Sequence, residues 1–172
     1  MLSLLPLLTL ALQGAGCDAG PLRSEDPYFT ALLNGAEWSA EPIALINRAG
    51  GLAVVGDTGA RERPCPPVAP CESLSLVADV PFGGPGAYAL HGVAGRTAFR
   101  YMDGDAVLAE YDAVGSSPGF TVTAYDNETG WVEGTFDLTF ALETSLFPPG
   151  TFTPPDTVRV SGGRFRAVAG RR

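Results

Sequence analysis

The stretch Trp131–Phe140 reads WVEGTFDLTF and separates apolar from polar side chains at alternate positions. A period of two is typical of a β-strand with one face on a hydrophobic core and the other face in water. The stretch therefore predicts a strand of a two-faced sheet. When the stretch is extended to Glu143, its apolar even positions are Val132, Gly134, Phe136, Leu138, Phe140 and Leu142. Its polar or amphipathic odd positions are Trp131, Glu133, Thr135, Asp137, Thr139 and Glu143.

Similar short apolar runs recur along the rest of the chain, with turn residues between them. No segment after residue 27 carries a convincing helical stripe, and 22 Gly and 15 Pro favour many turns. We therefore expect an all-β fold, either a single antiparallel β-sandwich or a partly open β-barrel, with about nine or ten strands. The apolar runs are Phe29–Asn34, Ile43–Ile46, Leu52–Val55, Leu74–Val80, Ala87–His91, Ala98–Met102, Ala106–Tyr111, Phe120–Tyr125, Trp131–Glu143 and Thr157–Ala167.

Two hairpins can be placed in register. Asp103-Gly104 suits a two-residue type I′ turn, and Asp126–Gly130 joins FTVTAY to WVEGTF. The first hairpin is expected to pair Tyr101 with Ala106, Arg100 with Val107, and Phe99 with Leu108. The second is expected to pair Phe120 with Phe136, Thr121 with Thr135, Val122 with Gly134, Thr123 with Glu133, Ala124 with Val132, and Tyr125 with Trp131.

A change of phase marks the last apolar run. Val158 and Val160 occupy even positions, whereas Phe165 is odd, and Gly162-Gly163 lies between them. A β-bulge at the two glycines would reset the alternation and keep these three side chains on one face. The Asn34-Gly35 pair similarly predicts a turn after the first run.

The first residues, MLSLLPLLTLALQGAGC, indicate export. The run is apolar and uncharged but shorter than a membrane span, as in the core of a signal peptide. Gly14-Ala15-Gly16-Cys17 resembles the lipobox of bacterial lipoproteins, which implies cleavage before Cys17 and lipid (palmitate among the acyl groups) on that residue. The alternative is an ordinary secretory signal that ends near a cysteine. The expected organisation is a signal peptide at 1–16, a lipidated Cys17 with a tether at 17–27, and an all-β domain at 28–172.

Export places the remaining cysteines, Cys65 and Cys71, in an oxidising compartment. They lie in RPCPPVAPC, where prolines stiffen the intervening loop. We expect a structural disulfide. A redox pair normally has a two-residue spacing at a helix start, and a metal site with His91 has no evident fourth ligand.

Composition narrows the classes of function. The chain has a net charge of −8, eleven basic residues that are all Arg, and one His. The charge disfavours nucleic-acid binding, and the absence of Lys excludes a Schiff-base or P-loop lysine. No catalytic motif is present, so we expect no catalytic residue, no cofactor and no metal site. The acids Asp103, Asp105, Asp126 and Glu128 match no calcium loop and are attributed to turns.

The candidate ligand-binding residues are Tyr125 and Trp131, expected side by side on the water-facing side of their hairpin. Exposed aromatic side chains commonly bind sugars or partner proteins. The alternative is a cross-strand aromatic pair that only stabilises the hairpin.

Three stretches of the chain together resemble a bacterial domain family of unknown function that occurs in small lipoproteins. These stretches are FTALLNGAEWSA, VEGTFDLTF and VRVSGGRF. The resemblance implies a lipid-anchored, all-β protein, and it supplies no catalytic or ligand-binding residues to carry over to this chain. Two classes of function follow from the sequence. The first is a binding or structural module of the cell envelope, held to a membrane (the outer membrane in a diderm) and contacting a glycan or an envelope protein. The second is an envelope hydrolase, for example one acting on carbohydrate, with an acidic site that no motif marks.

Overall fold

The computed structural model describes residues 26–59, 72–89, 96–115, 119–148, 150 and 152–171. These residues form ten strands in one mixed sheet, which confirms the expected all-β fold and strand number. The strands are β1 (Tyr28–Leu33), β2 (Ala36–Ile46), β3 (Gly51–Asp57), β4 (Glu72–Pro81), β5 (Gly86–Tyr88), β6 (Thr97–Asp103), β7 (Ala106–Val114), β8 (Phe120–Tyr125), β9 (Trp131–Ser145) and β10 (Thr157–Arg171).

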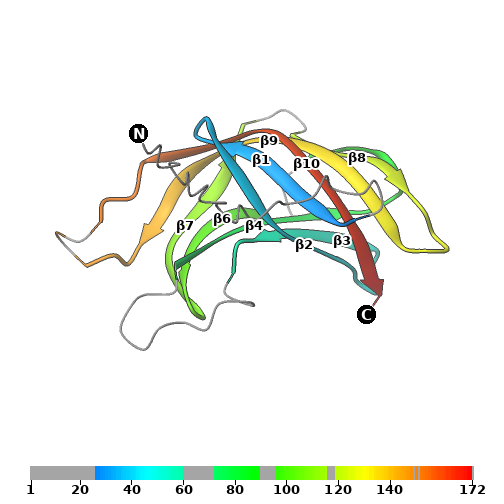
Figure 1. The fold of residues 1–172 in the computed structure, drawn as a ribbon, viewed down its shortest axis with the longest axis horizontal. Helices are drawn as coiled ribbons and strands as arrows, with labels where there is room; N and C mark the ends of the chain where they lie inside the picture. Colours follow the sequence, from blue (N-terminus) through cyan, green and yellow to red (C-terminus); the bar gives the residue numbers. More distant parts are fainter. Residues whose placement is uncertain are drawn as a thin grey trace, which may run out of the picture.

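The sheet curls into a ring rather than a regular barrel (Figure 1). Hydrogen-bonded neighbours follow the order β1, β2, β3, β4, β6, β7, β9 and β10, and β10 returns to β1. Strands β8 and β5 extend the sheet from the first half of β9, because β7 pairs only with its second half. One pairing departs from the expected antiparallel sheet: Ala169–Arg171 of β10 run parallel to Ala44–Ile46 of β2.

Strand β2 is longer than the expected run Ile43–Ile46, because it begins at Ala36 and continues through Pro42. Its first half pairs with β1 and its second half with β3, and the change of partner falls at Glu41, which lies opposite Asp57. The Asn34-Gly35 turn between β1 and β2 is confirmed, with φ of 50° and 85°. The Asn34 Oδ1 atom accepts a hydrogen bond of 2.8 Å from the Arg159 N–H, so the turn is fixed to the start of β10.

The β6–β7 register predicted from the sequence is wrong. Asp103 pairs with Ala106 and Met102 with Val107, so the turn residues are Gly104 and Asp105. Leu108 is an extra residue in β7, and Tyr101 therefore lies opposite Ala109. A bulge at Leu108 shifts every later pair, and as a result Arg100 faces Glu110 rather than Val107.

The β8–β9 register is right for its first half and wrong for its second. Phe120 lies opposite Phe136, Thr121 opposite Thr135, and Val122 opposite Gly134, as expected. Beyond them Thr123 is an extra residue, so Ala124 meets Glu133 and Tyr125 meets Val132. Because the bulge adds one residue, the alternation of side chains in the last part of β8 changes phase, and Tyr125 lies on the other face of the sheet.

The bulge expected at Gly162-Gly163 is confirmed. Opposite β9, the pairing passes from Val160 with Leu138 directly to Gly163 with Phe136. The extra backbone is bound by Asp137, whose Oδ1 atom accepts a 2.8 Å hydrogen bond from the Gly162 N–H. Val158, Val160 and Phe165 are all fully buried, so the bulge keeps the apolar residues of β10 on the inner face.

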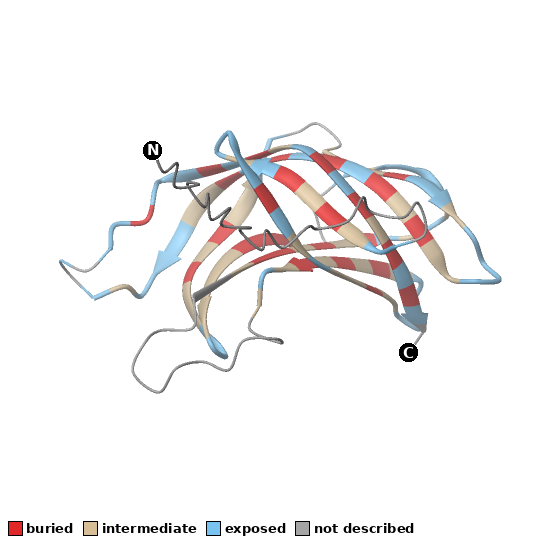
Figure 2. Ribbon diagram, in the orientation of Figure 1, coloured by how far each residue is buried: buried red, intermediate tan, exposed pale blue. Residues whose placement is uncertain are grey.

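Aromatic rings fill the inside of the ring of strands. Figure 2 shows buried residues alternating with more exposed ones along many of the strands. The even positions of β9 from Val132 to Phe140 are buried, as the sequence predicts. Burial, together with the charges of Tyr101 and Asp156, raises the pKa of Tyr111 to about 12, so this phenol stays neutral in the core. The largest buried aromatic side chains are Phe29, Phe99, Tyr111, Phe120, Phe136, Phe140 and Phe165.

Within the described part of the chain, no helix has the length and apolar character needed to cross a membrane.

Candidate functional site

The structure separates the two aromatic residues that the sequence placed side by side. After the bulge at Thr123, Tyr125 packs against the core, with its ring edge-on to Phe82 at 5.0 Å between centroids. Trp131 stays on the outer face, where it lies opposite Val168 of β10. The expected Tyr125–Trp131 pair is therefore wrong, and the binding patch built on it does not form in that arrangement.

Trp131 has a different partner on the outer face. The guanidinium carbon of Arg166 lies 4.5 Å from the centre of the Trp131 ring, and the Arg166 Nε atom lies 3.1 Å from Glu133 Oε1. Cation–π contact and ion pairing together hold the Arg166 side chain flat against the sheet. Trp131 is thus half-buried beneath an arginine rather than freely exposed.

The loop after Tyr125 is built by Asp126. Its Oδ1 atom accepts from the Glu128 N–H at 2.8 Å, and its Oδ2 atom accepts from the Thr129 hydroxyl at 2.7 Å. These hydrogen bonds, led by the one from Thr129, lower the pKa of Asp126 below its usual range. The carboxylate accepts these hydrogen bonds within the turn, which agrees with its interpretation as a turn residue.

A line of polar side chains crosses the outer face of five strands. Cross-strand partners point to the same side of a sheet, with Cβ atoms about 4.5–5.5 Å apart. The buried neighbours of these residues face inward, so the line faces water. We call it the hydroxyl row. Its members, in register from β2 through β1, β10 and β9 to β8, are Ser39, Thr30, Arg164, Thr135 and Thr121.

Arg164 stands at the centre of the hydroxyl row and is exposed. Among the described residues it has no acidic partner, unlike Arg166, Arg96 and Arg100, which all pair with glutamates. In a chain with a net charge of −8, an exposed arginine between two threonines is available for a negatively charged group from outside.

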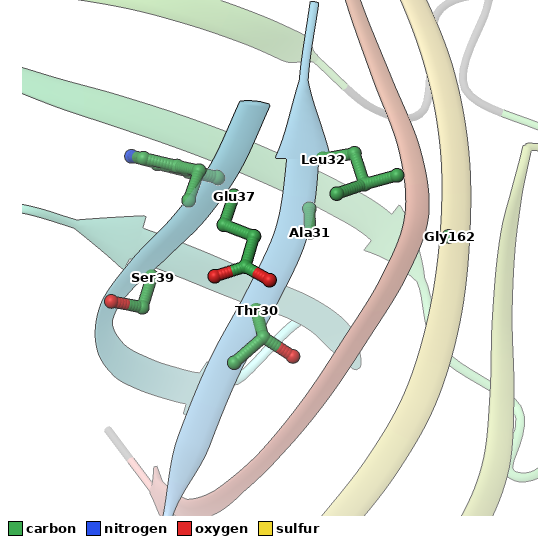
Figure 3. Close-up of a pocket in the computed structure, with 7 residues that line it drawn as sticks. Thr30, Ala31, Leu32, Glu37, Ser39 and Gly162 are labelled. Carbon is green, nitrogen blue, oxygen red and sulfur yellow. The ribbon is translucent and has the colours of Figure 1, made fainter. Parts of the chain in front are cut away.

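An open groove adjoins the end of the hydroxyl row (Figure 3). Its volume is about 470 Å³, within the range of small-molecule sites. Thr30 and Ser39 belong to both the row and the groove, and Leu32 contributes an apolar side chain that is 42% exposed. In Figure 3 the Glu37 carboxylate lies between the side chains of Thr30 and Ser39. The lining residues are Thr30, Ala31, Leu32, Glu37, Trp38, Ser39 and Gly162.

A second polar cluster lies on the outer face of β7 and β9. One carboxylate oxygen each from Glu110, Asp112 and Glu143 lie within 4.8 Å of one another, close enough to bind a single cation. Two arginines already neutralise Glu110: Arg96 forms an ion pair with it, and the Arg100 Nε atom lies 2.6 Å from its Oε2. Sequence reasoning missed this cluster, because Glu143 reaches it as the extra residue of a bulge opposite β7.

The carboxyl of Glu143 lies beside that of Asp112, and the two groups interact. A hydrogen bond to Asp112 and the negative charge of that residue raise the pKa of Glu143 above its ordinary 4.5. A raised pKa in the folded state gives stability that is present in acid and is lost as the pH rises through the folded value.

Glu143→Gln is expected to raise the melting temperature at about pH 7 and to leave it almost unchanged at about pH 4. Gln can donate a hydrogen bond to Asp112 at both pH values, whereas Glu143 loses its proton, and with it this hydrogen bond, as the pH rises through its raised pKa. Thermal melts at the two pH values measure the difference. In an Asp112→Asn background the same substitution should have a much smaller pH-dependent effect, because Asp112 is the largest cause of the shift. A stabilisation that is independent of pH in both backgrounds would refute the interaction of Glu143 with Asp112.

Several residues singled out by the sequence lie outside the described part of the chain. They are Cys17, Cys65, Cys71 and His91. Lipidation of Cys17 and the Cys65–Cys71 disulfide therefore stay predictions.

Comparisons of the chain with protein family models, with curated proteins and with solved structures found no match. The case for function therefore rests on the residues of this chain.

Proposed function

We propose that the chain is a lipid-anchored module of the bacterial cell envelope that binds an envelope component through the outer face of its sheet. The N-terminal sequence supports the anchor, because an apolar leader ends at Cys17 and a short polar tether follows. Strand β1 begins at Tyr28, so about ten residues separate the cysteine from the folded sheet.

The observation that carries the binding role is the hydroxyl row with its groove. The inner face of the ring is filled by buried aromatic side chains, whereas the described groove opens on polar residues of the outer face. The open groove combines the hydroxyls of Thr30 and Ser39 and the Glu37 carboxylate with apolar side chains, a mixture that suits binding of a ligand.

An envelope hydrolase is the second candidate, and one observation favours it. The raised pKa of Glu143 beside Asp112 is the pattern of a carboxyl pair in which one member serves as a general acid. The cluster lies on an open strand surface and two arginines engage Glu110, so we place binding first. Release of sugar from envelope polysaccharide by the wild type, abolished by Glu143→Gln, would reverse this order.

The anchor is tested by Cys17→Ser in the full chain, expressed in a bacterium and separated into membrane and soluble fractions. The wild type is expected in the membrane fraction, and the variant in the soluble fraction, because the acyl chains hold the protein to the bilayer. The double variant Cys65→Ser/Cys71→Ser is the matched control and should remain with the membrane. Equal distribution of the wild type and Cys17→Ser would show that Cys17 carries no anchor.

A further inference from the structure

The hydroxyl row presents both kinds of hydrogen-bonding group to solvent. Ser39, Thr30, Thr135 and Thr121 each carry a hydroxyl that donates and accepts, and Arg164 donates only. Four strand spacings of about 4.8 Å give the row a length of about 19 Å. The row is therefore a long, shallow polar strip rather than a pocket for one small ion.

The groove adds a free carboxylate to this strip. Among the residues that the structure describes, Glu37 has no hydrogen bond or ion pair, and it lies opposite the half-exposed Leu32. A simple anion would be repelled by Glu37. A molecule with many hydroxyl groups can donate to this carboxylate and at the same time place its carbon face on Leu32.

We propose that the hydroxyl row and the groove bind an acidic glycan, a polysaccharide chain that carries carboxylate groups. The inference rests on the proposed role as an envelope-binding module and names the class of its ligand. The Arg164 guanidinium pairs with a carboxylate of the glycan, in the forked geometry that arginine favours. The hydroxyls of the row and the Glu37 carboxylate bind the hydroxyl groups of the sugar rings on either side.

A protein partner fits this surface less well. The cores of protein interfaces are depleted of Glu and Ser, whereas this strip holds Ser39 and also Glu37, which has no ion pair among the described residues. Three of the exposed large apolar residues, Val114, Leu146 and Phe152, lie outside the five strands of the row. The charge of the row and the long open shape both point to an extended, hydroxyl-rich anion.

The test uses the full chain, extracted from membranes in detergent, on an array of carboxylate-bearing glycans. The array includes an oligogalacturonate and its methyl ester, which share one backbone and differ in charge. We expect at least one carboxylated glycan to bind with a Kd below about 1 mM, and the charged form to bind better than the ester. No binding to any carboxylated glycan, or equal binding of acid and ester, would overturn the proposal. Retention of envelope proteins without retention of any glycan would overturn it too.

Variants locate the site by titration with the glycan that binds most tightly. Arg164→Ala is expected to raise the Kd about 10- to 100-fold, since a charge-assisted hydrogen bond is lost. Arg48→Ala removes the same charge in the β2–β3 turn, away from the row, and should leave the Kd within about twofold. Equal losses for the two variants would show attraction by net charge alone and would refute the site.

Glu37→Gln separates a glycan from a simple anion. The substitution is expected to raise the Kd several-fold if sugar hydroxyls donate to the carboxylate, whereas tighter binding would show a ligand that Glu37 only repels. Thr30→Val keeps the shape of a β-branched side chain and removes one hydroxyl, and should weaken binding about 2- to 10-fold. The anchor is judged separately by fractionation of Cys17→Ser. A membrane-bound chain that binds no acidic glycan refutes this inference alone, and a soluble chain that binds one refutes the anchor alone.

Discussion

Phe136→Ala is expected to lower the free energy of unfolding by about 3–5 kcal/mol, because it opens a cavity in the core beneath β1, β9 and β10. The Phe136 side chain is 1% exposed, and its ring centroid lies 4.8 Å from that of Phe29 and 6.5 Å from that of Phe165. It also fills the space above Gly163, where the bulge of β10 leaves no side chain. Strands β1, β9 and β10 therefore all lose contacts at once.

Chemical denaturation of wild type and variant measures this loss. Phe152→Ala is the matched control, because Phe152 is 47% exposed and does not belong to the buried core, although its ring lies 4.9 Å from that of Phe147. That substitution should cost only about 0.5–1.5 kcal/mol. Similar losses for the two variants would contradict the placement of Phe136 in the core.

Gly134→Ala is expected to destabilise the protein by about 1–3 kcal/mol, although it adds a single methyl group. A Cβ atom at this position would overlap the carbonyl oxygen of Thr121 and the ring of Phe165. The first is backbone of the neighbouring strand and the second is a buried ring stacked on Phe120 at 5.2 Å, so neither moves easily. The sequence GTF thus has a glycine where β8 and β10 approach β9 closely.

The melting temperature of Gly134→Ala, compared with that of Gly83→Ala, tests this close approach. Gly83 is exposed, and a Cβ atom there would have no atom within 4 Å. The control should therefore melt with the wild type within about 1 °C, whereas Gly134→Ala should melt several degrees lower. An unchanged melting temperature for Gly134→Ala would show that β8 does not pack on β9 at Thr121.

Much of the fold follows from local pattern. The alternation of β9, the Asn34-Gly35 turn, the bulge at Gly162-Gly163 and half of the β8–β9 register are confirmed. Each rests on a strong signal, either strict alternation of side chains or glycine at a turn or bulge.

Other parts of the fold had no local signal. The bulges at Leu108 and Thr123 contain no glycine, and the residues around them are Val107, Ala109, Ala124 and Tyr125, which tolerate either face. Alternation could not detect the change of phase there. The parallel contact of β10 with β2 joins residues more than a hundred positions apart, and no pairing rule within one hairpin predicts it.

Only one cross-strand pair of the hydroxyl row could be predicted from the sequence. Thr121 opposite Thr135 follows from the hairpin register, whereas Thr30 and Ser39 join Arg164 only when β10 closes the ring against β1. A single sequence gives no register for that closure. The acids of β7 carried a weak signal, since Glu110 and Asp112 stand two apart in a strand and share a face, but Glu143 had none.

The account depends most on the outer face of β2, β1, β10, β9 and β8 being the binding face. Backbone amide NMR shifts of the protein, titrated with the bound acidic glycan, test this most directly. The account predicts that the perturbed amides are those of the hydroxyl row and the groove, centred on Thr30 and Arg164, with saturation at one Kd for all of them. Perturbations centred on Glu110, Asp112 and Glu143, with Thr30 and Arg164 unchanged, would contradict it.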